Sequence, residues 1–460
     1  MIPPATRDDL KQLGWTHLDV VLVTGDAFID SPYMGVAMIA RVLLSSGFRV
    51  GVIAQPDIRF GEDIKRLGEP RLFWGVTGGS IDSMVANYTA TGKRRKTDDY
   101  TPGSRNNRRP DRAAIVYSQL IRQHFKKTRP IVLGGIEASL RRVSHYDFWS
   151  NRIRRSILFD AKADYLVYGM AEKTVAALAE TLATGKDPSG LRGLCYISRR
   201  PVSGYLELPS HETVTRSKPA FSDMFRMFYN ETDPVTGRGL FQLQDSRYLV
   251  QNPPPSVLSR EELDAMYNLP FTYRLHPFDE RLGKVRALET IQFSITTHRG
   301  CYGECNFCAI GVHQGRTVQW RSESSIVEEV KRISSQPDFK GIIQDVGGPT
   351  ANMYGFECRK KIEKGICRNR RCIFPDICPN LPVSHGAQTR LLKKMASLPG
   401  IRKVFVRSGI RYDLLNAGNP HDGKAYLKHL VSHHVSGQLK VAPEHIDANI
   451  LSLMGKQKID

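Results

Sequence analysis

Three cysteines at the spacing C-x3-C-x2-C are the residues with the clearest chemical potential in this chain: Cys301, Cys305 and Cys308. Thiolates are the soft ligands that iron–sulfur clusters prefer. Because a four-iron cluster has four irons to ligate, three cysteines leave one iron without a protein ligand. An open metal position is typical of a catalytic site rather than a structural one. The alternatives are buried thiols or half of a zinc site, to which His298 or His313 would add a ligand.

The residues around these cysteines favour the iron–sulfur interpretation. Gly300 and Gly303 allow the loop to curl tightly. With this spacing the chain resembles the radical SAM superfamily. There the open iron binds the amino and carboxylate groups of S-adenosylmethionine, and one electron from the [4Fe-4S] cluster cleaves the sulfonium to yield a 5'-deoxyadenosyl radical. The resemblance also implies that the aromatic ring of Phe307 packs near the adenine.

Further cofactor-binding residues are expected where later strands end. The apolar run 341–346 is followed by Gly347, Gly348 and Pro349. In the superfamily this turn is usually Gly-Gly-Glu and its backbone accepts the methionine amino group, a role that proline tolerates because it keeps its carbonyl. Two more strand-like runs precede a last set of residues. Since TIM-like folds place their chemistry at the carboxyl ends of strands, we expect this set to line the barrel mouth: Ser408, Arg411 and Glu444.

Four more cysteines lie within 21 residues, at Cys358, Cys367, Cys372 and Cys378. Four thiols so close in sequence suit a second metal, which would be an auxiliary iron–sulfur cluster or zinc. Their spacing contains no C-x2-C pair of the common zinc patterns. Arginines among them are suited to stabilising thiolate charge. A reduced loop without metal is the alternative.

The first 200 residues alternate apolar strand-like runs with helical patterns. Such alternation predicts an α/β domain with a doubly wound parallel sheet, in which ligands bind at the carboxyl ends of the strands. Pairs of small residues stand at those ends, for example Gly78-Gly79 and Gly134-Gly135. No G-x-G-x-x-G fingerprint is present, so NAD is not proposed. The architecture resembles the cobalamin-binding domains that precede some radical SAM barrels, but without a D-x-H-x-x-G motif we do not expect cobalamin as a cofactor.

The chain is therefore expected to contain three regions. Residues 1–200 form the Rossmann-like α/β domain, 201–285 a proline-rich connector, and 286–460 a radical SAM TIM-like (β/α) barrel. Four strand-like runs occur before Asp460, whereas radical SAM barrels typically have six. The barrel is thus expected to be partial, and the chain is interpreted as a fragment. Whether these 460 residues are active alone is left open.

The charge is strongly positive and uneven. The net charge is +20, and the region Lys93–Arg155 holds 17 Lys/Arg against 5 Asp/Glu, an excess of 12. Such a region is suited to nucleic-acid phosphates, with a solvated basic loop as the alternative. No signal peptide or membrane-spanning run is found, so no membrane partner is expected. Seven of the eight cysteines lie between Cys301 and Cys378, which favours metal sites in a reducing cytoplasm over disulfides.

Longer motifs resemble one family, the YgiQ-type radical SAM proteins. The matching segments are Gly51–Pro56, Gly134–Arg142, Asp160–Asp164, Asp345–Tyr354, Cys358–Cys378 and Lys440–His445. This resemblance implies a radical SAM enzyme that uses a [4Fe-4S] cluster and S-adenosylmethionine, with an electron donor as partner. It assigns neither substrate nor catalytic residues. The alternative function is a metal-containing RNA-binding protein without radical chemistry, which would use the region Lys93–Arg155.

Overall fold

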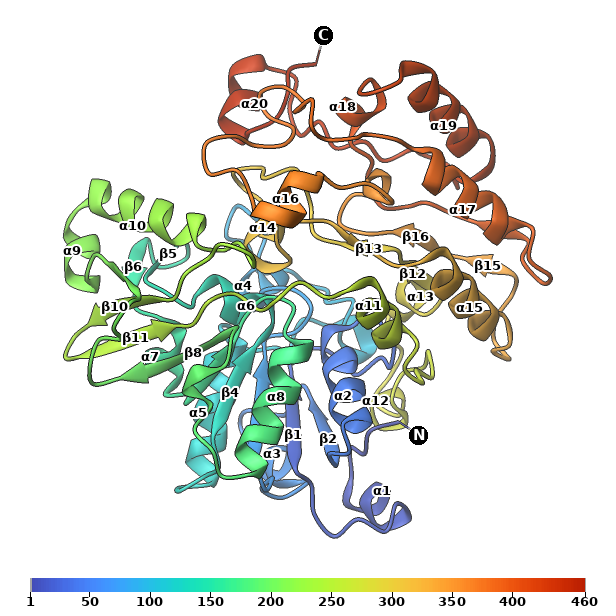
Figure 1. Ribbon diagram of the computed structural model, residues 1–460. Coiled ribbons are helices and arrows are strands. Elements are labelled where there is room, and N and C mark those ends of the chain that lie inside the picture. The colour runs from blue at the N-terminus through green and yellow to red at the C-terminus, as the bar shows by residue number, and fades with distance from the viewer. Residues whose placement is uncertain (1, 460) are drawn as a thin grey trace. The chain divides into compact units, whose positions relative to one another are not determined.

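The computed structural model describes residues 2–459 of the chain, which divides into two units (Figure 1). The N-terminal unit comprises the residues up to Ser256 together with Leu269–Leu288, and the C-terminal unit comprises Val257–Asn268 and the residues from Glu289 onward. Over residues 2–459, no helix is both long and apolar enough to cross a membrane.

The N-terminal unit is built on a nine-stranded sheet of order β2-β1-β3-β4-β7-β8-β11-β10-β9. Its parallel part consists of β1 (Val20–Thr24), β2 (Val50–Ala54), β3 (Phe73–Thr77), β4 (Ile131–Gly134) and β7 (Tyr165–Val167). Every residue of β1 is buried, as the apolar run Val20–Val23 predicts for a strand covered on both faces. The predicted doubly wound parallel sheet is confirmed.

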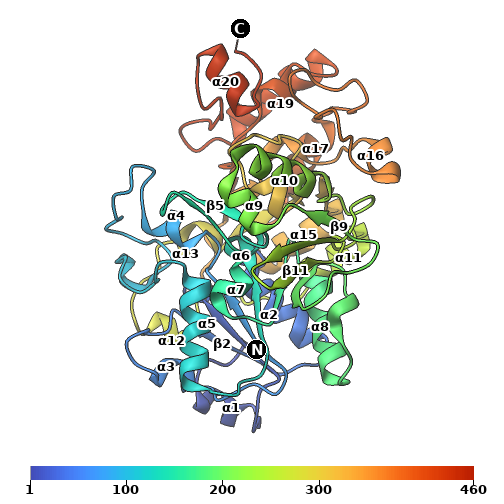
Figure 2. The ribbon, with the colours of Figure 1, turned by 90° about the vertical axis from the view of Figure 1, so that its left-hand side faces the viewer.

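Helices cover this sheet. The longer ones are α2 (Gly35–Ser45), α5 (Ala113–His124), α8 (Glu172–Ala183) and α10 (Lys218–Asn230). Helices α2 and α8 lie side by side, whereas α5 lies beside α7 (Ile157–Ala161), as Figures 1 and 2 show. Shorter helices are α1 (Arg7–Gln12), α3 (Glu62–Lys65), α4 (Ser83–Asn87), α6 (Gly135–Leu140), α9 (His211–Arg216) and α12 (Pro277–Glu280). A small hairpin joins β5 (His145–Asp147) to β6 (Arg152–Arg154).

The sheet continues into residues predicted to form a connector. Strand β8 (Leu194–Ser198) lies at the end of the predicted first domain, whereas β9 (Leu206–Leu208), β10 (Leu240–Gln244) and β11 (Arg247–Gln251) lie in the predicted connector. The pairings of these four strands are largely antiparallel. Several inward-facing side chains here are polar and break the apolar alternation that identifies strands. Gln242 accepts a hydrogen bond from the Ser144 backbone at 3.0 Å, and Gln251 accepts one from Arg142 Nε at 2.8 Å. Long-range partners thus satisfy buried amides that a sequence pattern cannot distinguish from loop residues.

The C-terminal unit repeats parallel strands and helices. Strand β12 (Ser294–Thr296) pairs in parallel with β16 (Asp345–Gly347), and β15 (Ile342–Ile343) pairs in parallel with β17 (Lys403–Val404). The long helices are α15 (Glu323–Ser334), α17 (Gly386–Ala396) and α19 (Pro420–His433), which pack in sequence order. Shorter ones are α11 (Arg260–Tyr267), α14 (Ile310–His313), α16 (Arg359–Lys364), α18 (Tyr412–Leu415) and α20 (Ala448–Met454). This order is the partial (β/α) arrangement that the sequence predicts.

Candidate metal centres

The first cysteine group lies on a tight loop, called here the three-cysteine loop, which spans Cys301–Cys308. It follows β13 (His298–Arg299), which pairs with β14 (Gln319–Trp320), and it ends before α14. Gly300 opens the loop with φ +81°, and a Cβ there would stand 2.2 Å from the Thr317 carbonyl oxygen. Only glycine fits this left-handed and crowded position. The predicted role of Gly300 in curling the loop is therefore confirmed.

Two of the three sulfurs lie on either side of Gly303. A Cβ on Gly303 would stand 3.3 Å from Cys301 Sγ and 3.4 Å from Cys305 Sγ. The Gly303 backbone donates a hydrogen bond to Cys301 Sγ at 3.3 Å, and the Cys308 backbone donates to the Cys305 carbonyl at 2.9 Å. Burial raises the pKa of the Cys301 and Cys308 thiols. Three soft donors on one short loop are a ligand set that fits an iron–sulfur cluster.

Arg411 supplies a positive charge to this loop. Its Nη1 lies 3.4 Å from Cys305 Sγ, and its Nε donates to Asp413 at 2.9 Å. Burial works to lower the pKa of Arg411, but the hydrogen-bonded Asp413 carboxylate outweighs it and the net shift is upward. A permanently charged guanidinium therefore faces the Cys305 sulfur.

The Gly-Gly-Pro turn lies beside the three-cysteine loop. Strands β12 and β16 are in register, and the Gly347 carbonyl accepts from the Thr297 backbone at 2.7 Å. A Cβ on Gly348 would stand 2.7 Å from His298 Nε2. Thr350, just after the half-buried Pro349, has its hydroxyl 3.8 Å from Cys301 Sγ. The structure thus brings the turn and the cysteines together.

Ser408 and Arg411 lie on the next strand ends. The Ser408 hydroxyl donates to Asp345 Oδ2 at 2.5 Å, and a Cβ on Gly347 would stand 2.9 Å from Ser408 Oγ. The Arg411 backbone donates to Asn352 Oδ1 at 2.8 Å, and Asn352 Nδ2 returns a bond to the Arg411 carbonyl at 2.9 Å. These side chains fix the positions of neighbouring turns relative to one another.

Phe307 and Glu444 are linked through Lys456. The Phe307 side chain is 55% exposed, and Lys456 Nζ lies 6.0 Å from its ring centre and 3.5 Å from the Glu444 carboxylate. The backbone of Asn306 donates to the Met454 carbonyl at 2.9 Å, so α20 lies against the loop. An exposed aromatic face beside a cation is available to a ligand.

Several of these residues escaped the sequence analysis. Asp345, Asn352, Asp413 and Lys456 hold predicted site residues in place. Three of them carried a signal: Asp345 and Asn352 lie inside a family motif, and Asp413 lies two residues after Arg411. Lys456 carried none, because it reaches the loop only through the folding of the last helix.

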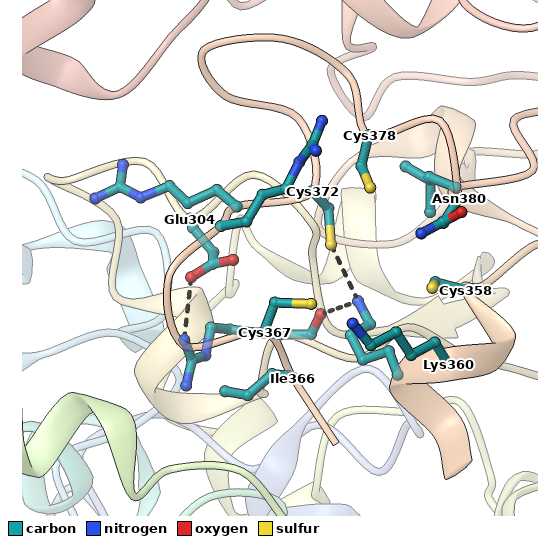
Figure 3. Close-up of a pocket in the computed structure, with 13 residues that line it drawn as sticks. Glu304, Cys358, Lys360, Ile366, Cys367, Cys372, Cys378 and Asn380 are labelled. Carbon is teal, nitrogen blue, oxygen red and sulfur yellow. Dashed lines mark hydrogen bonds and ion pairs between the residues drawn. The ribbon is translucent and has the colours of Figure 1, made fainter. Parts of the chain in front are cut away.

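The second group, called here the four-cysteine pocket, also lies in the C-terminal unit. One cavity is lined by Cys358, Cys367, Cys372 and Cys378 together with Glu304, Arg316 and Lys361 (Figure 3). Burial raises the pKa of the Cys372 thiol to about 11. Throughout residues 2–459, no group of three or more His, Cys, Asp or Glu side chains is already arranged to hold a metal ion. Metal binding at either group therefore requires rotation of the thiol side chains.

Comparisons with known proteins identify the family. The family model described as Radical SAM N-terminal matches residues 3–294. A UPF0313 protein of Fusobacterium nucleatum is 53% identical over 454 residues, which cover 98% of this chain and 80% of the relative. The chain belongs to the UPF0313 family of YgiQ-type radical SAM proteins. A second UPF0313 protein, of Thermotoga maritima, is 49% identical over 464 residues, covering 100% of this chain and 81% of the relative.

Solved structures similar to this UPF0313 member share its fold. The cobalamin-dependent S-adenosylmethionine radical enzyme OxsB with aqua-cobalamin bound has a TM-score of 0.53 and 12% identity. The match covers 96% of this chain and 46% of that chain, so this chain spans less than half of OxsB. At this identity the similarity supports the α/β architecture and nothing finer.

Buried charged side chains lie at the strand ends of the N-terminal unit. Asp26, Arg109 and Glu137 are buried there. Arg109 donates to Asp26 at 2.6 Å and to the Gly25 carbonyl at 2.9 Å. A Cβ on Gly78 would stand 2.4 Å from Glu137 Oε2. A buried ion pair and a buried carboxylate therefore lie at these strand ends.

The basic region of this UPF0313 member divides into two parts. Arg109, Arg141 and Arg142 are buried or nearly so, and the first two pair with Asp26 and Asp82. The run 93–96 is exposed. Part of the positive charge therefore serves the fold, and RNA contact through the exposed part stays a prediction.

Proposed function

We propose that this chain is a radical SAM enzyme whose three-cysteine loop holds a [4Fe-4S] cluster. The observation that carries the proposal is the meeting of three features: three thiols on a tight loop, a buried guanidinium 3.4 Å from Cys305 Sγ, and the Gly-Gly-Pro turn beside them. When bound, the cluster would supply the electron that cleaves S-adenosylmethionine to a 5'-deoxyadenosyl radical. The substrate that this radical attacks is not assigned.

The chain's own residues are suited to binding and orienting S-adenosylmethionine. The Gly347 carbonyl already accepts hydrogen bonds from the backbone and hydroxyl of Thr297, at 2.7 and 3.2 Å. The carbonyls of Gly348 and Pro349 are therefore our candidates to receive the methionine amino group. Phe307 offers a ring face to the adenine, and Lys456 holds Glu444 close to that ring.

Single cysteine substitutions test this function. The full chain is reconstituted anaerobically with iron and sulfide, reduced, and given S-adenosylmethionine, and 5'-deoxyadenosine is quantified by chromatography. Cys305→Ala should reduce its formation to background, because two thiols cannot hold the cluster. Cys195→Ala, which removes a buried thiol of the N-terminal unit, is the matched control and should retain it. Undiminished 5'-deoxyadenosine from Cys305→Ala would refute the assignment.

A further inference from the structure

We infer that the four-cysteine pocket is a second metal centre, closed by four thiolates from Cys358, Cys367, Cys372 and Cys378. Its occupant is a soft thiophilic centre, either a zinc ion or an iron–sulfur cluster. This inference does not depend on radical chemistry at the three-cysteine loop. It assigns the pocket a complete protein ligand set, with no open position for a small molecule.

The four thiols reach one cavity from separate points of the chain. Cys358 directly precedes α16 and Cys367 follows that helix after a short turn. Cys372 and Cys378 lie on the next loop, where the Cys378 backbone donates to the Cys372 carbonyl at 2.8 Å. Figure 3 shows the four sulfurs around the same hollow. All four side chains are exposed or half-buried, so none is locked in a closely packed core.

The charge of the lining suits a metal thiolate. A zinc ion or an iron–sulfur cluster with four thiolates carries net negative charge. The charged side chains that line the cavity are one carboxylate and five cations, namely Glu304, Arg316, Lys360, Lys361, Arg370 and Arg371. A pocket for a free metal cation held by carboxylates would show the opposite balance. The excess of cations therefore complements an anionic centre.

Lys361 is the most constrained of these cations. Its side chain is 4% exposed, and its Nζ lies 3.7 Å from Cys372 Sγ. The ammonium is held by the Glu357 carboxylate at 2.9 Å and by the Arg316 carbonyl at 2.8 Å, and it lies 4.7 Å from the centre of the Tyr302 ring. A buried ion pair is costly unless it is well partnered. Here its positive end is directed at a sulfur that would carry negative charge in a metal thiolate.

Core packing explains only part of this group. Cys358 and Cys372 pack partly against the buried cluster around Tyr302, Phe356 and Ile373, as structural thiols do. Cys367 is exposed, and no packing role accounts for a fourth thiol at the same cavity. All four thiols are free. A shared ligand accounts for the half-buried and the exposed thiols together.

The first test separates the two centres by stoichiometry. The full-length Cys301→Ala/Cys305→Ala/Cys308→Ala variant is loaded anaerobically, in separate samples, with zinc alone and with ferrous iron plus sulfide. Metal and acid-labile sulfide are then counted per chain. The inference is supported if the variant retains one equivalent of zinc, or one sulfide-containing iron cluster that absorbs visible light. Which of the two is retained identifies the occupant. Binding of neither overturns it. Failure of S-adenosylmethionine cleavage in the wild type would leave this result unaffected.

The second test uses the wild-type chain, so it does not depend on whether a variant folds. Cys367 is exposed in the metal-free chain and should react quickly with iodoacetamide. After metal loading it should be protected, and a strong chelator should restore its reaction, as mass spectrometry would show. Cys195 is the control, since it is fully buried and should stay unreactive in all samples. Fast alkylation of Cys367 after loading, or a disulfide at Cys367, would overturn the inference.

Discussion

The three-cysteine loop and the four-cysteine pocket share one feature, a buried ion pair whose cation lies beside a cysteine sulfur. Each sets a buried ion pair against one sulfur: Arg411 and Asp413 beside Cys305 at 3.4 Å, and Lys361 beside Cys372 at 3.7 Å. They differ in what surrounds the thiols. The loop has three thiols and a glycine turn beside them, whereas the pocket has four thiols and a cationic lining. Ligand number and the neighbouring backbone, rather than the cation, thus distinguish the open centre proposed at the loop from the closed centre proposed at the pocket.

The largest expected effect comes from breaking these ion pairs. Arg411→Met leaves Asp413 buried without its partner, and Lys361→Met does the same to Glu357. Removal of one member of a buried pair costs about 3–5 kcal/mol. Both variants should lose that much free energy of unfolding in urea titrations of the metal-free chain. The double variant Lys361→Met/Glu357→Gln should recover part of the loss, because no unpaired charge remains. A loss below about 1 kcal/mol in both single variants would contradict the shared feature.

A smaller effect on the free energy of unfolding is expected from pH, through a histidine next to the three-cysteine loop. Burial lowers the pKa of His298, beside the Gly-Gly-Pro turn, from 6.5 to about 4. The unfolded chain therefore binds this proton more tightly, so stability should fall as the pH drops below 6.5 and level off below about 4. The full loss from this one group is on the order of 3 kcal/mol. Urea titrations at pH 7 and 5 should show a smaller loss for His298→Gln than for the wild type. Equal losses would exclude His298 as the cause.

The smallest effect on stability is expected at Phe307. Because its ring is 55% exposed, Phe307→Leu should change the free energy of unfolding by no more than about 0.5 kcal/mol. The affinity of the Phe307→Leu variant for S-adenosylmethionine should nevertheless fall several-fold, because the adenine loses its stacking surface. Calorimetry on the reconstituted chain would measure this affinity. Metal content of the four-cysteine pocket should not change. Unaltered affinity would remove Phe307 from the site.

The parallel sheet and the cysteine groups could be predicted because their signals are local. Four of the five residues of strand β1 form an apolar run, Val20–Val23, and the spacing of Cys301, Cys305 and Cys308 indicates metal-binding chemistry directly. The strands between residues 201 and 251 could not, since their buried glutamines are satisfied by residues about 90 to 110 positions away. For the same reason Arg109 reads as part of a basic loop, although it is buried against Asp26. Hydrogen-bond and ion-pair partners that lie far apart in sequence produce no local sequence pattern.

We propose that the three-cysteine loop holds a cluster with one open iron. The most direct test is an electron paramagnetic resonance spectrum of the reduced, anaerobically reconstituted chain, recorded with and without S-adenosylmethionine. The wild type should show a [4Fe-4S]⁺ signal that shifts when S-adenosylmethionine is added, and the shifting component should be missing from Cys305→Ala. A spectrum that S-adenosylmethionine leaves unchanged, or a shifting component that persists in Cys305→Ala, would contradict the account.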